Sequence, residues 1–128
     1  SNQSAQFSSK LPGDIAALGK CTNLVTANFR WCRNITGSFE VFVGLLVLPE
    51  LDISSTSVDC SRALELISSA PWAPQIKKLG LACTNAQGDI AALGNCTNLE
   101  RAYFYKCDKI TGTFTGTLVR LISNIRDK

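Results

Sequence analysis

Cysteine is the residue type in this chain that is best suited to covalent or metal chemistry. Six cysteines occur among 128 residues, and an even number is typical of disulfide frameworks. No C-x-x-C pair is present, so a zinc site or thioredoxin-like exchange lacks support. Histidine is absent, which excludes a Ser-His-Asp triad, a Cys-His pair and every histidine-ligated metal site. We therefore predict a protein that is not an enzyme, with no catalytic residues, no metal and no cofactor.

Three N-x-[ST] sequons, at Asn2, Asn34 and Asn95, are candidate glycosylation sites. The pattern also arises by chance in a chain rich in Asn and Thr. Methionine is absent, so Ser1 is not a translation start, and we expect a processed product or a part of a longer chain. These features favour a secreted protein or one of an organelle lumen, while the compartment itself stays open.

The composition limits the other classes of partner. Apolar residues make up 45% of the chain and charged residues 18%, which excludes a disordered tail. The net charge of +3 comes from scattered residues, so we predict no nucleic-acid binding. The longest apolar run, residues 41–49, has about half the ~20 residues that a membrane-spanning helix needs, and we predict no transmembrane segment.

An internal repeat organises the chain. Residues 13–40 read GDIAALGKCTNLVTANFRWCRNITGSFE, and residues 88–115 read GDIAALGNCTNLERAYFYKCDKITGTFT. Aligned on Gly13 and Gly88, these two copies share 18 of 28 positions. Two divergent copies between them follow the same pattern, L-x-x-[LA]-x-[LIF]-x-x-[CT]. The first residues of this pattern, the anchors of the four copies, are Leu24, Leu48, Ile76 and Leu99.

Positions counted from the anchors predict one strand in each copy. The residues at +3 and +5 share the parity of a strand and are expected to point into the core, while those at +1, +2, +4, +6 and +7 face outwards. The residue at +8 is expected to bond to the backbone of the neighbouring copy. The predicted inward residues are Ala27, Leu51, Leu79 and Ala102 at +3, Phe29, Ile53, Leu81 and Phe104 at +5, and Cys32, Thr56, Thr84 and Cys107 at +8.

The four copies, whose anchors recur at similar intervals, resemble the leucine-rich repeat family over nearly the whole chain. The Ile-Thr-Gly turns at Ile35 and Ile110 look closest to plant-like and protist-type repeats. The resemblance implies a single α/β domain over residues 1–128, with about four repeats and partial coils at both ends. It also implies a short right-handed solenoid, with a parallel sheet on the concave side and helical or 3₁₀ segments on the convex side.

The segments that return the chain to each next strand carry apolar residues every three positions, which suits a 3₁₀-like wall facing the core. In the second copy this spacing assigns Phe39, Phe42 and Leu45 to the core. Two explanations stay open for the remaining aliphatic residues: docking against another protein or a lipid-adjacent surface, or a thicker buried wall. We call these residues the convex apolar wall, and they are Val41, Val43, Leu46 and Val47.

The third copy is longer than the others and predicts an α-helix over residues 61–69. Asp59 or Ser61 is the candidate cap at its start, and the prolines at 71 and 74 prevent its continuation. Residues 118–125 have a similar apolar spacing. They are predicted either to cap the solenoid or to begin a further repeat.

The repeat also bears on cysteine pairing. Cys32 and Cys107 are equivalent positions, as are Cys21 and Cys96, and each pair is three copies apart. At ~5 Å per strand they are separated by on the order of 15 Å, beyond the ~7 Å limit for a disulfide, so we predict four buried free thiols. Cys60 and Cys83 are the only remaining candidate pair, and their different offsets in the repeat disfavour a bridge.

The outward positions of the predicted strands would form the concave face. The two near-identical copies diverge most at these positions, and Trp, Tyr and Arg there are the residue types that dominate binding hot spots. The alternative is that they are ordinary solvated strand residues. The residues that we predict to bind a partner on this face are Arg30, Trp31, Glu50, Asp52, Lys78, Arg101, Tyr103 and Tyr105.

The resulting functional hypothesis is a non-catalytic protein-interaction or scaffold module that binds a protein partner through the solenoid surface. The alternative is a structural or accessory subunit of a large assembly, for example an algal membrane-protein supercomplex, associated peripherally with a membrane. A protein partner is expected in both cases.

Overall fold

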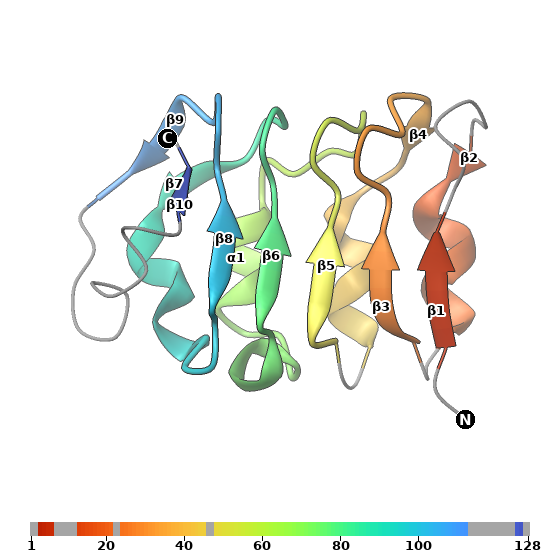
Figure 1. Cartoon of the computed structure of the whole chain (residues 1–128), viewed down its shortest axis with the longest axis horizontal. Helices are drawn as coiled ribbons and strands as arrows, with labels where there is room; N and C mark the ends of the chain where they lie inside the picture. The colour runs from red at the N-terminus through yellow and green to blue at the C-terminus, as the bar shows by residue number, and fades with distance from the viewer. Residues whose placement is uncertain (1–2, 7–12, 22–23, 46–47, 113–124, 127–128) are drawn as a thin grey trace.

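The computed structural model describes residues 3–6, 13–21, 24–45, 48–112 and 125–126, and its main feature is a six-stranded parallel sheet. The strands lie side by side in chain order, with the helical segments behind them (Figure 1). The protein is therefore mixed α/β with parallel strands. The strands are β1 (Gln3–Gln6), β3 (Leu24–Asn28), β5 (Glu50–Asp52), β6 (Lys78–Gly80), β8 (Arg101–Tyr103) and β10 (Ile125–Arg126).

Helical segments and two small parallel sheets form the layer behind the main sheet (Figure 1). Strand β2 (Gly13–Asp14) pairs with β4 (Ile35–Thr36), and β7 (Gln87–Asp89) pairs with β9 (Lys109–Thr111). The helical segments are 3₁₀ helices η1 (Ile15–Lys20), η2 (Phe39–Gly44), η3 (Ala73–Gln75) and η4 (Ile90–Asn95), and α-helix α1 (Ala63–Ile67). No helix in the described ranges has the length and apolar character needed to cross a membrane.

The core lies between the main sheet and this layer, and the predicted inward residues form it. The sheet register places the four residues at +3 opposite one another across β3, β5, β6 and β8, and each is at most 1% exposed. The four residues at +5 are fully buried. Counting from the sequence anchors therefore identifies the core side of each strand correctly.

Three of the four described 3₁₀ helices, η1, η2 and η4, begin at capping side chains, which explains where these return segments start. Asp14 Oδ1 accepts a hydrogen bond from Ala16 N at 2.8 Å before η1, and Asp89 Oδ1 accepts one from Ala91 N at 2.9 Å before η4. A capping carboxylate satisfies a backbone N–H that has no partner inside the helix. The three-residue apolar spacing is confirmed as a 3₁₀ wall, because residues such as Ile90 and Leu93 are buried.

Helix α1 is shorter than the predicted helix over residues 61–69, and neither predicted residue caps it. Asp59 Oδ1 instead accepts hydrogen bonds from Ser61 N and from Asn85 Nδ2, both at 3.0 Å. The carboxylate is thus bound ahead of the helix by a residue of the next copy. Of the predicted terminal segment, residues 118–124 lie outside the described residues, and Ile125 belongs to strand β10.

All six cysteines are free, so the candidate Cys60–Cys83 bridge does not form. Of the four thiols predicted to be buried, Cys21 is only half-buried, and the other three are buried. Cys60 is buried and Cys83 is exposed, so the two thiols lie in different environments. The residues at position +8 behave differently from one another. Cys107 Sγ donates to Leu81 O of the preceding copy at 3.0 Å, as expected. Thr56 and Thr84 instead donate to carbonyls three residues earlier in their own copies.

Candidate functional site

The face of the main sheet opposite the helical layer, here called the outer sheet face, brings the predicted partner-binding residues together. One row across the sheet contains Thr26, Glu50, Lys78 and Arg101, in register from β3 to β8. The next row contains Asn28, Asp52, Gly80 and Tyr103. The other predicted residues, Arg30, Trp31 and Tyr105, follow β3 and β8 directly. All eight predicted residues therefore lie on, or next to, one surface.

Two aromatic side chains project from this surface. Trp31 is 53% exposed and Tyr105 is 44% exposed, and among the described residues these are the exposed large hydrophobic side chains. Water-exposed aromatic rings of this size are the typical anchors of protein–protein contacts. The outer sheet face thus presents two large exposed aromatic rings.

Arg30 joins the two ends of the predicted site. Its Cζ lies 5.5 Å from the ring centroid of Trp31 and 5.7 Å from that of Tyr103, within cation–π range. Because β5 and β6 lie between β3 and β8, this contact spans the middle of the outer sheet face. A second cation–π contact places Lys106 Nζ 5.4 Å from the ring centroid of Tyr105. The aromatic rings are therefore already paired with cationic side chains of the same chain.

Asp52 differs from its predicted role as an exposed acidic residue, because it is only 2% exposed. Its Oδ1 accepts a hydrogen bond from Ser54 N at 3.0 Å, and its Oδ2 lies 4.0 Å from Lys78 Nζ. The carboxylate lies across Gly80 of the neighbouring strand, where a Cβ atom would overlap it. Glu50, one row away, is exposed as predicted. The predicted acidic stripe is thus one exposed carboxylate and one covered carboxylate.

Ser54 and Gly80 are parts of this site that sequence reasoning did not select. Ser54 is 2% exposed, donates its N–H to Asp52 and accepts a hydrogen bond from Ala82 N at 3.1 Å. Gly80 provides the space in which the Asp52 carboxylate lies. The available signal was the smallness of the third copy's outward residues, which leaves room for side chains from neighbouring strands.

A surface hollow of about 470 Å³ adjoins Trp31 at the carboxyl ends of the strands. The outward residue at position +7 of every copy lines it, and each has a positive φ, between 56° and 70°. Backbone hydrogen bonds continue across these turns, for example from Trp31 N to Ser54 O at 2.9 Å. The turns are therefore stacked in a fixed relation to one another. The residues at this position are Trp31, Ser55, Cys83 and Lys106.

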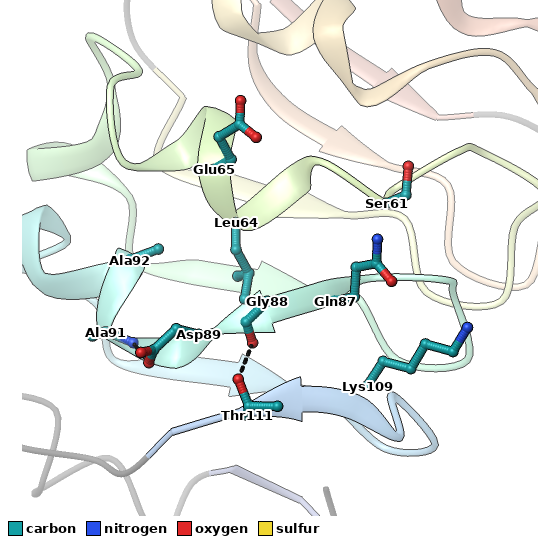
Figure 2. Close-up of a pocket in the computed structure, with 10 residues that line it drawn as sticks. All are labelled: Ser61, Leu64, Glu65, Gln87, Gly88, Asp89, Ala91, Ala92, Lys109 and Thr111. Carbon is teal, nitrogen blue, oxygen red and sulfur yellow. Dashed lines mark hydrogen bonds between the residues drawn. The ribbon is translucent and has the colours of Figure 1, made fainter.

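A second hollow, of about 650 Å³, lies between α1, β7 and β9 (Figure 2). Figure 2 shows Glu65 and Lys109 on opposite sides of it and Leu64 directed towards Gly88. Its carboxylates already have partners: Glu65 pairs with Arg62 at 2.7 Å, and Asp89 caps η4. This hollow therefore brings together no nucleophile and base that would indicate a reaction.

The convex apolar wall is only partly described. Val41 and Val43 are half-buried, and Val41 packs against the core. Leu46 and Val47 lie outside the described residues. In the described part, Val41 fits the thicker-wall explanation.

Neither a metal site among the described residues nor a similarity to a known protein identifies a function for this surface. Within the described part of the chain, no group of three or more Cys, Asp or Glu residues is placed to hold a metal ion. Comparison of the chain with protein-family models, with curated proteins and with solved structures finds no match.

Proposed function

We propose that the chain is a short right-handed leucine-rich-repeat solenoid whose concave side is the outer sheet face. Three features support this fold: the chain order of the parallel strands, the register of the residues at +3, and the 3₁₀ return segments. In such a fold each coil buries its inner face only against its neighbours, so the outer sheet face is free to vary.

We further propose that the protein is a non-catalytic interaction module that binds a protein partner through this face. The observation that carries the proposal is the arrangement of Arg30, Trp31 and Tyr103, in which one cation bridges aromatic rings from two distant copies. Arg, Trp and Tyr grouped at the centre of a surface are the residues that contribute most to protein binding. Tyr105 extends the same surface.

A peptide-display selection tests this proposal. A random peptide library is selected on the wild-type chain, and the binders are then measured against a Trp31→Ala/Tyr103→Ala double variant and against Glu65→Gln on the opposite side. Binders should lose affinity by about tenfold or more in the double variant, as expected for hot-spot residues, and keep it in Glu65→Gln. Binders whose affinity is the same for the double variant and the wild type would refute the assignment of partner binding to this face.

The size of the isolated chain tests the alternative of a subunit buried in a large assembly. Light scattering after size-exclusion chromatography should give a folded monomer of 13.8 kDa if the chain is an independent interaction module. Aggregation that is relieved by polar substitution of Val41 and Val43 would favour the assembly subunit instead.

A further inference from the structure

The Asp52 carboxylate is the least satisfied polar group in the described part of the chain. Its side chain is 2% exposed, and its Oδ2 is buried and accepts no hydrogen bond from any described residue. Lys78 Nζ, at 4.0 Å, forms a long ion pair with Oδ2 but is beyond hydrogen-bond distance, so the charge of the carboxylate is only partly compensated. Burying a carboxylate oxygen without a donor is costly, so such a group is retained in a structure only when something compensates for it.

A second cationic donor on this face, Arg30, is directed away from Asp52. Arg30 projects over the same part of the sheet, but its guanidinium lies against the rings of Trp31 and Tyr103. Its contact with Tyr103 spans β5 and β6, the strands that hold Asp52 and Gly80. A covered carboxylate and a pair of cation-binding rings therefore lie in the same small area, and a side chain of this protein occupies the rings.

We propose that Asp52 is the receptor for a basic side chain of the protein partner, arginine above all. The incoming guanidinium would replace Arg30 on Tyr103 and donate a charge-assisted hydrogen bond to Asp52 Oδ2. Tyr103, which lies in the same row of the sheet as Asp52, would then cover the new ion pair. This inference rests on the proposed function, because it names the chemistry of the partner that the outer sheet face binds.

Gly80 and Ser54 make this receptor site. The absence of a side chain at Gly80 leaves the space in which the carboxylate lies, and Ser54 N donates to Oδ1, so Oδ2 is the oxygen without a hydrogen-bond donor among the described residues. A carboxylate held in one orientation loses little conformational freedom when it binds, which favours recognition of a planar, two-pronged donor. Glu50 lacks this support, since it is exposed.

Nuclear magnetic resonance titration of the full 128-residue chain tests the site with a defined probe. N-acetyl-L-arginine methylamide is added at constant ionic strength, with the neutral N-acetyl-L-citrulline methylamide as its matched control. The arginine probe should give saturable shifts at the amides of Ile53, Ser54 and Gly80, and the citrulline probe should give none. Asp52→Asn should weaken binding by about tenfold or more, whereas Glu50→Gln, with the same change of charge on the same strand, should retain it within about twofold.

Arg30→Gln provides the sharpest second variant. Because Arg30 occupies the rings that the probe needs, its removal should strengthen binding of the arginine probe. Equal binding by Asp52→Asn and the wild type, or no saturable shift in either the wild type or Arg30→Gln, would overturn the proposal. Suppose that display peptides without a basic residue bind the outer sheet face and bind the Asp52→Asn variant as tightly as the wild type. This result would refute the arginine site at Asp52 but not the proposed function. Arginine binding at Asp52 together with peptides that bind elsewhere would refute only the proposed function.

Discussion

The first and fourth copies of the repeat, residues 13–40 and 88–115, share their scaffold almost completely and differ in what they present. Their η1 and η4 helices have the same length and the same aspartate cap, at 2.8 and 2.9 Å. A threonine in each copy donates to the carbonyl of the glycine that precedes that aspartate, at 3.4 Å from Thr36 and 3.3 Å from Thr111. Identical sequence has therefore produced the same aspartate caps and the same threonine contacts in the two copies.

The outward residues of the two copies are different, and they are complementary. The first copy contributes the cation Arg30, and the fourth contributes the ring of Tyr103 that it contacts across two strands. The corresponding residues are Tyr105 in the fourth copy and Asn28 in the first. Two repeats with the same scaffold thus form one composite surface because their outward positions diverged. The comparison teaches that the scaffold and the surface can be perturbed separately.

The largest effect is expected from the buried phenylalanines that occupy position +5 of the two copies. Phe29 and Phe104 are both fully buried. Replacement of either by alanine should lower the free energy of unfolding by about 3–5 kcal/mol, because each leaves a large cavity in the core. Urea denaturation measures both variants. If one variant loses less than half the unfolding free energy that the other loses, the two copies do not pack equivalently.

The turn glycines should give the next largest effect. Gly37 and Gly112 have φ values of 111° and 90°, and a Cβ at either would overlap the capping aspartate behind it. Alanine at either position should cost about 2 kcal/mol, from backbone strain and from displacement of the cap. Gly94→Ala is the matched control, since nothing lies within 4 Å of a Cβ there and its φ is not positive. The control should be neutral in thermal denaturation.

The aspartate caps should give a smaller and equal effect in the two copies. Removal of a capping side chain costs about 1 kcal/mol, so Asp14→Ala and Asp89→Ala should each lose that much. Asn also accepts this hydrogen bond, and Asp14→Asn and Asp89→Asn should retain most of the stability. Chemical denaturation compares all four variants. A full loss in the asparagine variants would show that the charge, rather than the hydrogen bond, stabilises the helix start.

Much of the scaffold could be predicted from sequence because it depends on local spacing. A period of two at the anchors identifies residues such as Leu51 and Leu79 as core residues, and a period of three predicts the 3₁₀ segments. Each of these features needs only the chain's own geometry and the burial of apolar side chains. The sheet register then places the same positions of successive copies opposite one another.

The features that sequence did not predict depend on contacts between copies. Asp59 does not cap α1 because the helix begins only at Ala63, and its carboxylate instead accepts hydrogen bonds from Ser61 N and from Asn85, 26 residues later. Asp52 is 2% exposed, its carboxylate lies where a Cβ at Gly80 would be, and Arg30 contacts Tyr103 from the other side of β5 and β6. The residue types on the outer sheet face were predicted, but their burial follows from how side chains of four strands pack together.

The smallest expected effect is a difference in thiol reactivity between Cys21 and Cys96. These residues occupy the same position in the two copies but differ in burial. Cys21 is half-buried, whereas Cys96 is 2% exposed beside Asn95, whose Nδ2 donates to Ser68 O at 2.8 Å. Burial raises the pKa of the Cys96 thiol from 9.0 to about 12. Iodoacetamide at pH 8 should therefore alkylate Cys21 before Cys96, since the thiolate is the reactive form and access is greater at Cys21.

Because the pKa of the Cys96 thiol is raised in the folded chain, we expect a small loss of folding stability at alkaline pH. Because the pKa of Cys96 is higher in the folded than in the unfolded chain, its contribution is complete below pH 9.0 and is lost progressively as the pH rises towards 12. Between pH 8 and ~9.5 the stability difference between the wild type and Cys96→Ala should narrow by about 1 kcal/mol. Urea denaturation at the two pH values measures this change. A constant difference, or faster alkylation of Cys96 than of Cys21, would show that the fourth copy's wall is more open than its contacts with Ser68 indicate.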